Sequence, residues 1–261
     1  MSQRTSTNLR FLDAGDAAFT VEFGDTIDPA LLAAVHALDA AIARLQAKGG
    51  LPGLIETMPT FRSLTVFFDP LLTGRESLID ALQALLAEAG HGEAADGHHW
   101  CLPVCYEGVC GPDLGETARA IGVTVADVVT LHSATEYLVY MLGFLPGFPF
   151  MGDLPEVLRL PRRAEPRVRV PAGSVAIATG LTAIYPWESP GGWHLLGRCP
   201  VSLFDPRRAS PSLLAAGDRV RFEPVSMVEF QRLERALRAG EIDPLQWLDT
   251  APASVAAGQA R

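Results

Sequence analysis

Residues 168–186 read VRVPAGSVAIATGLTAIYP. This stretch contains three short apolar runs, and turn-forming Pro-Ala-Gly-Ser and Thr-Gly steps separate them. Short runs of this kind with turn residues between them are typical of a β-barrel or a β-sandwich. The stretch therefore predicts that the second half of the chain folds around a β-sheet core.

The same pattern continues on both sides of this stretch. A few short helices are also expected there, each marked by a capping residue at its start and a glycine or histidine near its end. The strands that we expect lie at 100–105, 138–142, 168–170, 175–178, 183–185, 193–196 and 219–222, and the helices at 112–122, 124–132 and 226–240.

The first ninety residues follow a different pattern, in which strand-like runs alternate with two helical stripes. A strand pair is expected at 9–23, and further strands at 55–58 and 64–68. Asp28-Pro29 supplies a helix start, and Gly49-Gly50 ends that helix. Thr73 and Glu76 form a capping box for a second helix. The order β-α-β-β-α predicts a small antiparallel sheet covered by two helices.

We therefore predict an α+β fold built from two domains. A small α+β domain is expected at residues 1–91, a β-barrel domain with a C-terminal helix at 98–248, and a flexible tail at 249–261. The boundary is placed in the polar, histidine-containing segment 91–99.

The composition excludes several classes of function. The net charge of −9 disfavours nonspecific binding to nucleic acid or to an anionic membrane. The first residues are polar, and no apolar run approaches the length of a membrane span, so we expect a cytoplasmic protein.

Two side-chain chemistries are also disfavoured by the pattern of the sequence. Lys48 is the only lysine and precedes Gly49-Gly50, which fits neither a Walker A loop nor a Schiff-base site. The spacing of Cys101, Cys105 and Cys110 is not that of a zinc knuckle, so we expect reduced thiols and no metal.

One segment with chemical character is GFLPGFPFMG at residues 143–152, which contains Phe144, Phe148 and Phe150. Its prolines and glycines exclude a helix. Such an aromatic loop either packs under the end of a barrel or lines a pocket or a partner surface.

A second segment, residues 159–169, contains five arginines against the single carboxylate of Glu165. Guanidinium groups suit the recognition of phosphate or carboxylate, so Arg162, Arg163 and Arg167 are candidates for anion binding. The alternative is a solvated basic edge that pairs with the acidic groups of the protein.

Polar residues among glycines form a third segment. Ser174, Thr182, Tyr185 and His194 lie close to glycines that allow a ligand to approach the backbone, although ordinary turn chemistry explains each glycine separately. The Gly-x-Ser-x-Gly pattern of a nucleophilic serine is absent. His132 ends a predicted helix, where it serves either as a capping residue or in proton transfer with Glu136.

Taken in order, these segments resemble the 5-oxoprolinase B subunit family, which includes the histidine-kinase inhibitor KipI and the so-called allophanate hydrolase subunit 1. The same module is part of the carboxyltransferase region of urea carboxylase. The resemblance covers nearly the whole chain. The motifs that carry it are Pro112-Asp113-Leu114, Leu131-His132-Ser133, Gly143-Phe-x-Pro-Gly-Phe148, Pro161-Arg-Arg163, Pro166-Arg167, Val170-Pro-Ala-Gly-Ser174, Ile184-Tyr-Pro186, Ser189-Pro-Gly-Gly-Trp193, Gly197-Arg198 and Leu203-Phe-Asp-Pro206.

The resemblance implies a cyclophilin-like barrel and one component of a heteromeric enzyme, inactive alone. The B and C subunits would use Mg-ATP on 5-oxo-L-proline, the A subunit would complete ring opening to L-glutamate, and no covalent cofactor is implied. The implied roles are anion contact for Arg162, Arg163, Arg167 and Arg198, polar groove groups for Ser174, Thr182 and Tyr185, a proton carrier in His132, and a pocket or partner loop formed by Phe144, Phe148, Phe150 and Trp193.

One departure from the family and two alternative functions remain open. Where the family commonly has Gly-Gln-Thr, this chain has Gly180-Leu181-Thr182. A KipI-like inhibitor of a sensor histidine kinase is one alternative. A carboxyltransferase component acting on a urea-like or amide substrate is the other, although this chain shows no biotin-attachment sequence.

Overall fold

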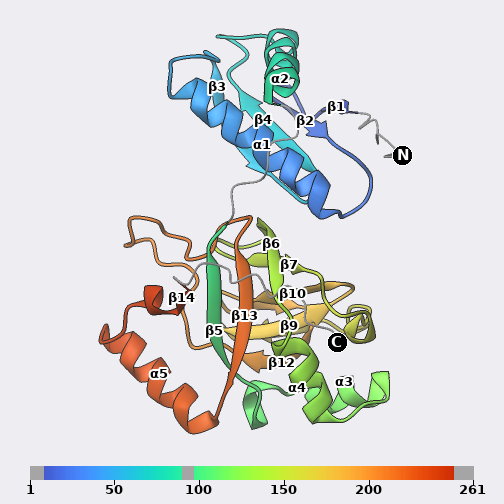
Figure 1. Ribbon diagram of the computed structural model, residues 1–261, viewed down its shortest axis with the longest axis vertical. Helices are drawn as coiled ribbons and strands as arrows, with labels where there is room; N and C mark the ends of the chain where they lie inside the picture. Colours follow the sequence, from blue (N-terminus) through green and yellow to red (C-terminus); the bar gives the residue numbers. More distant parts are fainter. Residues whose placement is uncertain (1–8, 90–96, 250–261) are drawn as a thin grey trace, which may run out of the picture. The chain divides into compact units, whose positions relative to one another are not determined.

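The computed structural model describes residues 9–89 and 97–249. The chain divides into two compact units, Met1–Ala95 and Asp96–Arg261, and each is described by itself (Figure 1). Most of the expected boundary segment, and the expected tail beyond Asp249, lie outside the described residues.

The first unit contains a four-stranded antiparallel sheet with the strand order β1-β2-β4-β3. The predicted strand pair in residues 9–23 is confirmed, as are the two later strands and both helices. The elements are β1 (Arg10–Asp13), β2 (Ala18–Glu22), α1 (Pro29–Gln46), β3 (Leu54–Pro59), β4 (Ser63–Phe68) and α2 (Arg75–Ala89).

Buried apolar residues alternate along the two central strands, β2 and β4, and form the core of this sheet. Phe19 and Val21 of β2 face Val66 and Leu64 of β4, and all four side chains are fully buried. Both helices contribute to the same hydrophobic cluster, since α1 and α2 bury their leucine stripes against these strands. Asp28 caps α1 as predicted, because its side chain accepts a hydrogen bond from the Ala30 amide at 2.7 Å.

The predicted capping box of α2 is wrong. The helix begins at Arg75, and the Leu78 amide donates to the carbonyl of Gly74. The Thr73 amide instead donates to the Asp69 carbonyl and closes the turn before the helix. Thr73 therefore belongs to this turn, and the position before the helix is occupied by a glycine.

The second unit is built mainly from β-strands, with short helices between and after them (Figure 1). Its elements are β5 (His99–Cys105), η1 (Gly108–Cys110), α3 (Leu114–Ile121), α4 (Val125–Ser133), β6 (Tyr137–Leu142), β7 (Pro149–Gly152), η2 (Glu156–Leu158), β8 (Arg167–Val170), β9 (Ser174–Ala178), β10 (Leu181–Ile184), β11 (Ser189–Gly191), β12 (His194–Arg198), β13 (Arg219–Val225), α5 (Met227–Ala239), η3 (Pro244–Trp247) and β14 (Leu248–Asp249).

The strands of this unit close into a seven-stranded barrel. The order is β12-β9-β10-β7-β6-β13-β5, and β5 pairs with β12 where Cys105 lies opposite Arg198. Strand β14 extends the sheet from β5. The expected barrel is confirmed. The β-sandwich, which the strand pattern also allowed, is excluded because the first and last strands of the sheet are hydrogen-bonded to each other.

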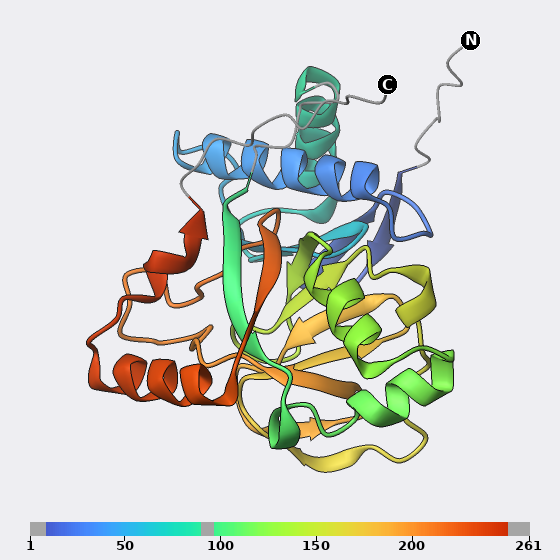
Figure 2. The ribbon, with the colours of Figure 1, turned by 60° about the horizontal axis from the view of Figure 1, so that its bottom comes forward.

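Helices cover the barrel on two sides. Helices α3 and α4 lie on one side of β5, and α5 lies on the other, as both ribbon views show (Figures 1 and 2). Phe230 of α5 packs on Cys105 and Cys110. Among residues 9–89 and 97–249, no helix is both long and apolar enough to cross a membrane.

Besides the two-residue β14, two strands were missed by the pattern of the sequence. Strand β7 lies inside the segment 143–152, which we expected to be a loop throughout, and it pairs with β6 and β10. Strand β11 contains a proline and two residues that favour turns, and it pairs with β8 outside the barrel. Both strands are too short for an alternation of apolar and polar residues to be recognised in the sequence.

The junction of β5 and β13 depends on the buried carboxylate of Asp218, which is 2% exposed. Its Oδ1 accepts from the His98 amide at 2.9 Å, and its Oδ2 accepts from the Trp100 indole at 3.0 Å and the Ala215 amide at 2.8 Å. These three donors come from the start of β5 and the turn before β13. The single side chain therefore holds the two parallel strands in register.

Replacing Asp218 by alanine leaves three donors without their acceptor, and about 1–3 kcal/mol are lost for each buried group of this kind. We expect Asp218→Ala to lower the free energy of unfolding of the barrel unit by about 3 kcal/mol or more. All four tryptophans, Trp100, Trp187, Trp193 and Trp247, lie in this unit, so tryptophan fluorescence in urea reports on it alone. The exposed Glu241→Gln serves as the control and should change stability by less than about 0.5 kcal/mol.

Candidate functional site

The start of helix α3 is fixed to the barrel by Asp113. This carboxylate is 2% exposed, and its Oδ2 accepts from the Leu195 amide of β12 at 2.7 Å. Its Oδ1 accepts from Arg167 at 2.5 Å and lies 3.5 Å from Nη1 of Arg163. A buried carboxylate needs such partners because its desolvation is costly when it is unpaired.

Two of the predicted anion-binding arginines therefore have partners inside the protein. Arg167 binds Asp113, and Arg163 also donates to Glu116 at 3.0 Å, which raises the pKa of the Arg163 guanidinium. The sequence did not show this, because Asp113 and Arg167 are separated by 54 residues. Their expected contact with a ligand anion stays a prediction, and in the chain alone their charges are compensated.

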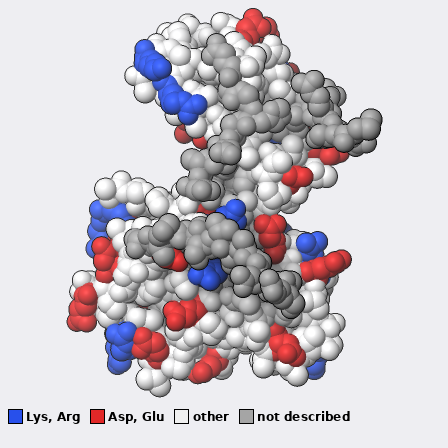
Figure 3. Space-filling model, viewed as in Figure 1, with Lys and Arg blue, Asp and Glu red and all other residues white. Residues whose placement is uncertain are grey.

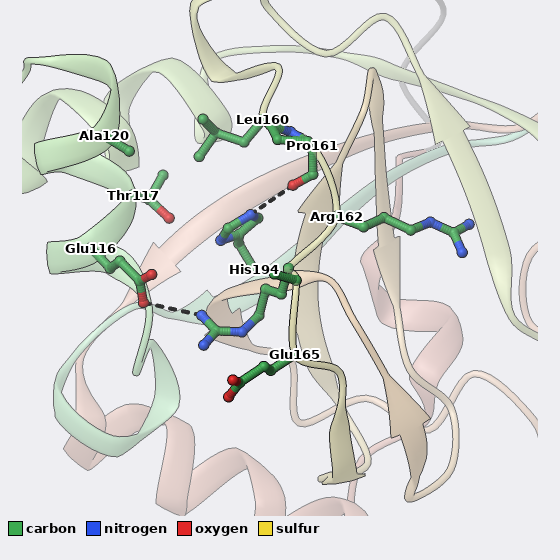
Figure 4. A pocket seen from close by; sticks show the side chains of 10 residues that line it. Glu116, Thr117, Ala120, Leu160, Pro161, Arg162, Glu165 and His194 are labelled. Carbon is green, nitrogen blue, oxygen red and sulfur yellow. Dashed lines mark hydrogen bonds and ion pairs between the residues drawn. The ribbon is translucent and has the colours of Figure 1, made fainter.

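A hollow of about 480 Å³ lies next to this cluster, between helix α3 and residues 160–165 (Figure 4). We call it the His194 hollow. Glu116, Thr117 and His194 line it, and Arg163 does so as well. Arg162 also belongs to its wall, but its side chain extends away from the hollow, and its guanidinium lies 6.0 Å from the centre of the Trp193 ring.

A second hollow, of about 540 Å³, lies between the 171–173 turn, the segment 198–208 and helix α5. We call it the arginine hollow. Arg198 and Arg208 contact backbone carbonyls there, whereas Arg207 and Arg238 pair with Asp205 and Glu234. Four guanidinium groups thus face two carboxylates, and the hollow has a local excess of positive charge.

The arginine hollow contains two of the predicted site residues, Arg198 and Tyr185. Sequence reasoning missed Arg207, Arg208 and Arg238. The Asp205-Pro-Arg-Arg208 turn was a signal for the first two, since prolines and adjacent arginines at a turn place basic side chains side by side. Arg238 gave no such signal, because it looks like any polar residue on the outer face of a helix.

The charges visible on one face of the barrel unit are mixed in sign. On the face drawn in Figure 3, basic and acidic side chains alternate and do not form one continuous basic field. The excess at the arginine hollow is therefore a local feature of an acidic chain.

Three predicted polar residues lie in the core. Ser174, Thr182 and His132 are 3%, 0% and 0% exposed. His132 Nδ1 lies 2.8 Å from the Tyr106 hydroxyl, and its Nε2 lies 2.9 Å from Thr182 Oγ1. Because the Thr182 hydroxyl donates to the Ala176 carbonyl, Nε2 of His132 must carry the proton and Nδ1 must accept from Tyr106.

This arrangement uses every polar atom of the His132 ring. Burial lowers the pKa of His132 to about 3, so the ring is neutral at physiological pH. The ring also stacks on Phe222 with a centroid separation of 4.9 Å. In the structure His132 thus joins α4 to β10 across the core, and the proton-carrier role expected for it stays a prediction.

The aromatic segment forms a small core of its own. Phe148 is 2% exposed, and its ring meets Tyr185 at 5.1 Å and Trp193 at 6.1 Å. Phe150 packs on Trp193, and Leu181, the residue that departs from the family pattern, contacts this cluster. Phe144 is 66% exposed, and the contact of its ring with Phe148, at 5.4 Å between centroids, places it at the outside of the cluster.

The comparisons with known proteins agree with this architecture. The family described as "Carboxyltransferase domain, subdomain C and D" matches residues 9–214. The chain is 39% identical over 226 residues to the 5-oxoprolinase B subunit of Bacillus subtilis (strain 168), and the match covers 83% of this chain and 92% of that protein. This chain belongs to the 5-oxoprolinase B subunit family. The family member from Escherichia coli O157:H7 is 46% identical over 177 residues, or 67% of this chain and 79% of that protein.

Solved structures extend the comparison. The crystal structure of TTHA0988 has a TM-score of 0.69 and 39% identity, and the match covers 80% of this chain and 40% of that one. The urea amidolyase of K. lactis has a TM-score of 0.71 at 22% identity over 87% of this chain and 15% of that chain, which shows a common fold alone. The 5-oxoprolinase B subunit family thus shares its fold with part of a much longer enzyme.

The neutral state of His132 gives a testable pH dependence. Its pKa is about 3 in the folded chain against an ordinary 6.5, so only the unfolded chain takes up the proton as pH falls between these values. The contribution of His132 to stability is complete above pH 6.5 and falls by about 1.4 kcal/mol per pH unit below it.

Imidazole nitrogen NMR measures this state directly. We expect the His132 signals to keep the pattern of the neutral Nε2–H form at about pH 5, where a histidine in a free peptide is mostly protonated. Protonation of His132 in the folded protein near its ordinary pKa of 6.5 would contradict the proposed hydrogen-bond chain.

Proposed function

We propose that the chain is the B subunit of an ATP-dependent 5-oxoprolinase that converts 5-oxo-L-proline to L-glutamate. The observation that carries this proposal is the 39% identity to a protein named as the B subunit of 5-oxoprolinase, over 92% of the length of that protein. We further propose that the protein acts in the cytoplasm, together with homologues of the A and C subunits, and is inactive without them.

The arginine hollow supports a role in holding anionic groups of Mg-ATP or of a phosphorylated intermediate. Nη1 of Arg208 is buried and has no hydrogen-bond partner within residues 9–89 and 97–249, which is costly for a charged group unless a ligand supplies an acceptor. Arg198 contributes a second guanidinium to the lining of the hollow, where its Nε donates to the neutral Ala172 carbonyl.

These arginines fit the chemistry of phosphoryl transfer. Negative charge spreads over the oxygens of the transferred group, and a protein accelerates the step mainly by positioning and electrostatic stabilisation. Guanidinium groups supply paired donors for such oxygens. In this chain Arg198 and Arg208 would orient the anion, while the Asp205 carboxylate holds Arg207 through two hydrogen bonds of 2.9 and 2.8 Å.

The requirement for partner subunits has support at the surface. Phe144 and Trp187 are 66% and 44% exposed, and Trp187 packs against Phe204 at one edge of the barrel. Exposed aromatic side chains of this kind are favoured at protein interfaces. We propose that this edge is covered by the C subunit, which completes the nucleotide site, so that the chain alone binds ATP weakly.

The direct test mixes the chain with homologues of the A and C subunits and follows ATP hydrolysis and glutamate, with and without 5-oxo-L-proline. We expect glutamate when all three proteins, ATP and 5-oxo-L-proline are present, and none when this chain is omitted. A stable complex that produces no glutamate would exclude 5-oxoprolinase as the function.

Substitution of Arg208 tests the anion site within that assay. Arg208→Gln keeps a polar side chain but removes a charge-assisted contact, so kcat/KM for ATP should fall about 10- to 100-fold. Arg232→Gln is the matched control, because Arg232 lies on α5 and pairs with Glu229 rather than lining the hollow. Equal activities of the two variants would remove Arg208 from the site.

A further inference from the structure

We propose that the His194 hollow binds a small amide, through an N–H group donated to His194 and a carbonyl group that accepts from Arg163 and Thr117. The site is distinct from the arginine hollow, with which it shares no lining residue. The choice of a cyclic amide as ligand rests on the proposed function.

The first observation is a group of buried polar atoms that have no partner within the described part of the chain. Oγ1 of Thr117, Nδ1 of His194 and Nε of Arg163 are each buried without a hydrogen bond, and all three residues line the hollow. Thr117 is 0% exposed, and its hydroxyl oxygen lies on the side that faces His194 (Figure 4). Buried polar atoms are nearly always paired, so three around one hollow indicate a ligand.

The second observation fixes which of these atoms donate. His194 Nε2 lies 2.9 Å from the carbonyl oxygen of Pro161, which can only accept, so Nε2 carries the proton. In the neutral ring Nδ1 is therefore an acceptor. Nε of Arg163 is a donor in every state, and the Thr117 hydroxyl can do both.

This pattern selects the chemical class of the ligand. The hollow needs one donor for His194 and one acceptor for Arg163, and an amide has both groups in one rigid plane. A carboxylate has no donor for Nδ1.

The size and the remaining wall fit a small ring. The volume of about 480 Å³ is far more than one water needs, and it lies within the range of small-molecule pockets. Ala120, Leu160 and Ala164 supply apolar surface beside the polar atoms. A five-membered lactam presents its N–H and carbonyl on the same edge and an apolar ring behind them.

The test is an NMR titration of this chain, without ATP or partner proteins, with three probes. We expect 2-pyrrolidinone and 5-oxo-L-proline to shift the His194 Nδ1 signal and the Thr117 amide, with affinities in the millimolar range that suits so small a ligand. N-methyl-2-pyrrolidinone lacks the N–H donor and should bind at least about 10-fold more weakly, the effect of one lost hydrogen bond.

Two substitutions separate a binding role from a structural role. Thr117→Val has the same shape without the hydroxyl, so it should weaken 2-pyrrolidinone binding about 3- to 10-fold without lowering the thermal midpoint, because the hydroxyl has no partner among the described residues. Thr117→Ser keeps the hydroxyl and should bind as the unchanged chain does. A lower midpoint of Thr117→Val with unchanged binding would overturn the proposal.

The outcomes also separate this site from the proposed function. Lactam binding at His194 together with an assembled but inactive complex would support the site and contradict the function. An active complex with no shift at His194 from 2-pyrrolidinone or 5-oxo-L-proline would contradict the site and leave the function standing. Equal binding of the N-methyl compound would show that the N–H donor is not recognised, and this too would overturn the proposal.

Discussion

The buried charge of Asp113 is the constraint on which the second unit depends most. A carboxylate at 2% exposure is stable only when its oxygens are paired, and its partners come from three separate parts of the chain. The Leu195 amide belongs to β12, Arg167 to β8 and Arg163 to the segment before it. Pairing one anion therefore positions a helix start, a barrel strand and an irregular segment together.

The His194 hollow is a direct result of that arrangement. Helix α3 forms one wall because Asp113 fixes its first turn. Residues 160–165 form the other because Arg163 pairs with Asp113 and with Glu116 of the helix. The arginine hollow has a different origin. It lies where α5 packs back on the barrel, and Arg198 meets the ring of Phe230 at 5.8 Å there.

Much of the fold was predictable from the sequence because its signals are local. The Asp28 cap, the Thr124–Asp127 capping box and the Ser226 cap all have the hydrogen bonds that their residue types predict. The candidate site was predictable only in part. The charge of an arginine is compensated by partners such as Asp113 and Glu116, which are distant in sequence. A buried atom without a partner among the described residues, such as Thr117 Oγ1, can be recognised only in the folded structure.

The hydrogen-bond chain through Tyr106, His132 and Thr182 has a direction, since each hydroxyl or ring N–H donates to the next group and the last donates to a carbonyl. Reversing one member leaves two donors or two acceptors facing each other in the core, and removing one leaves a buried polar atom without its partner. The residue types at these three positions can therefore change during evolution only together. Within the family they should co-vary, although 26 residues separate Tyr106 from His132 and 50 separate His132 from Thr182.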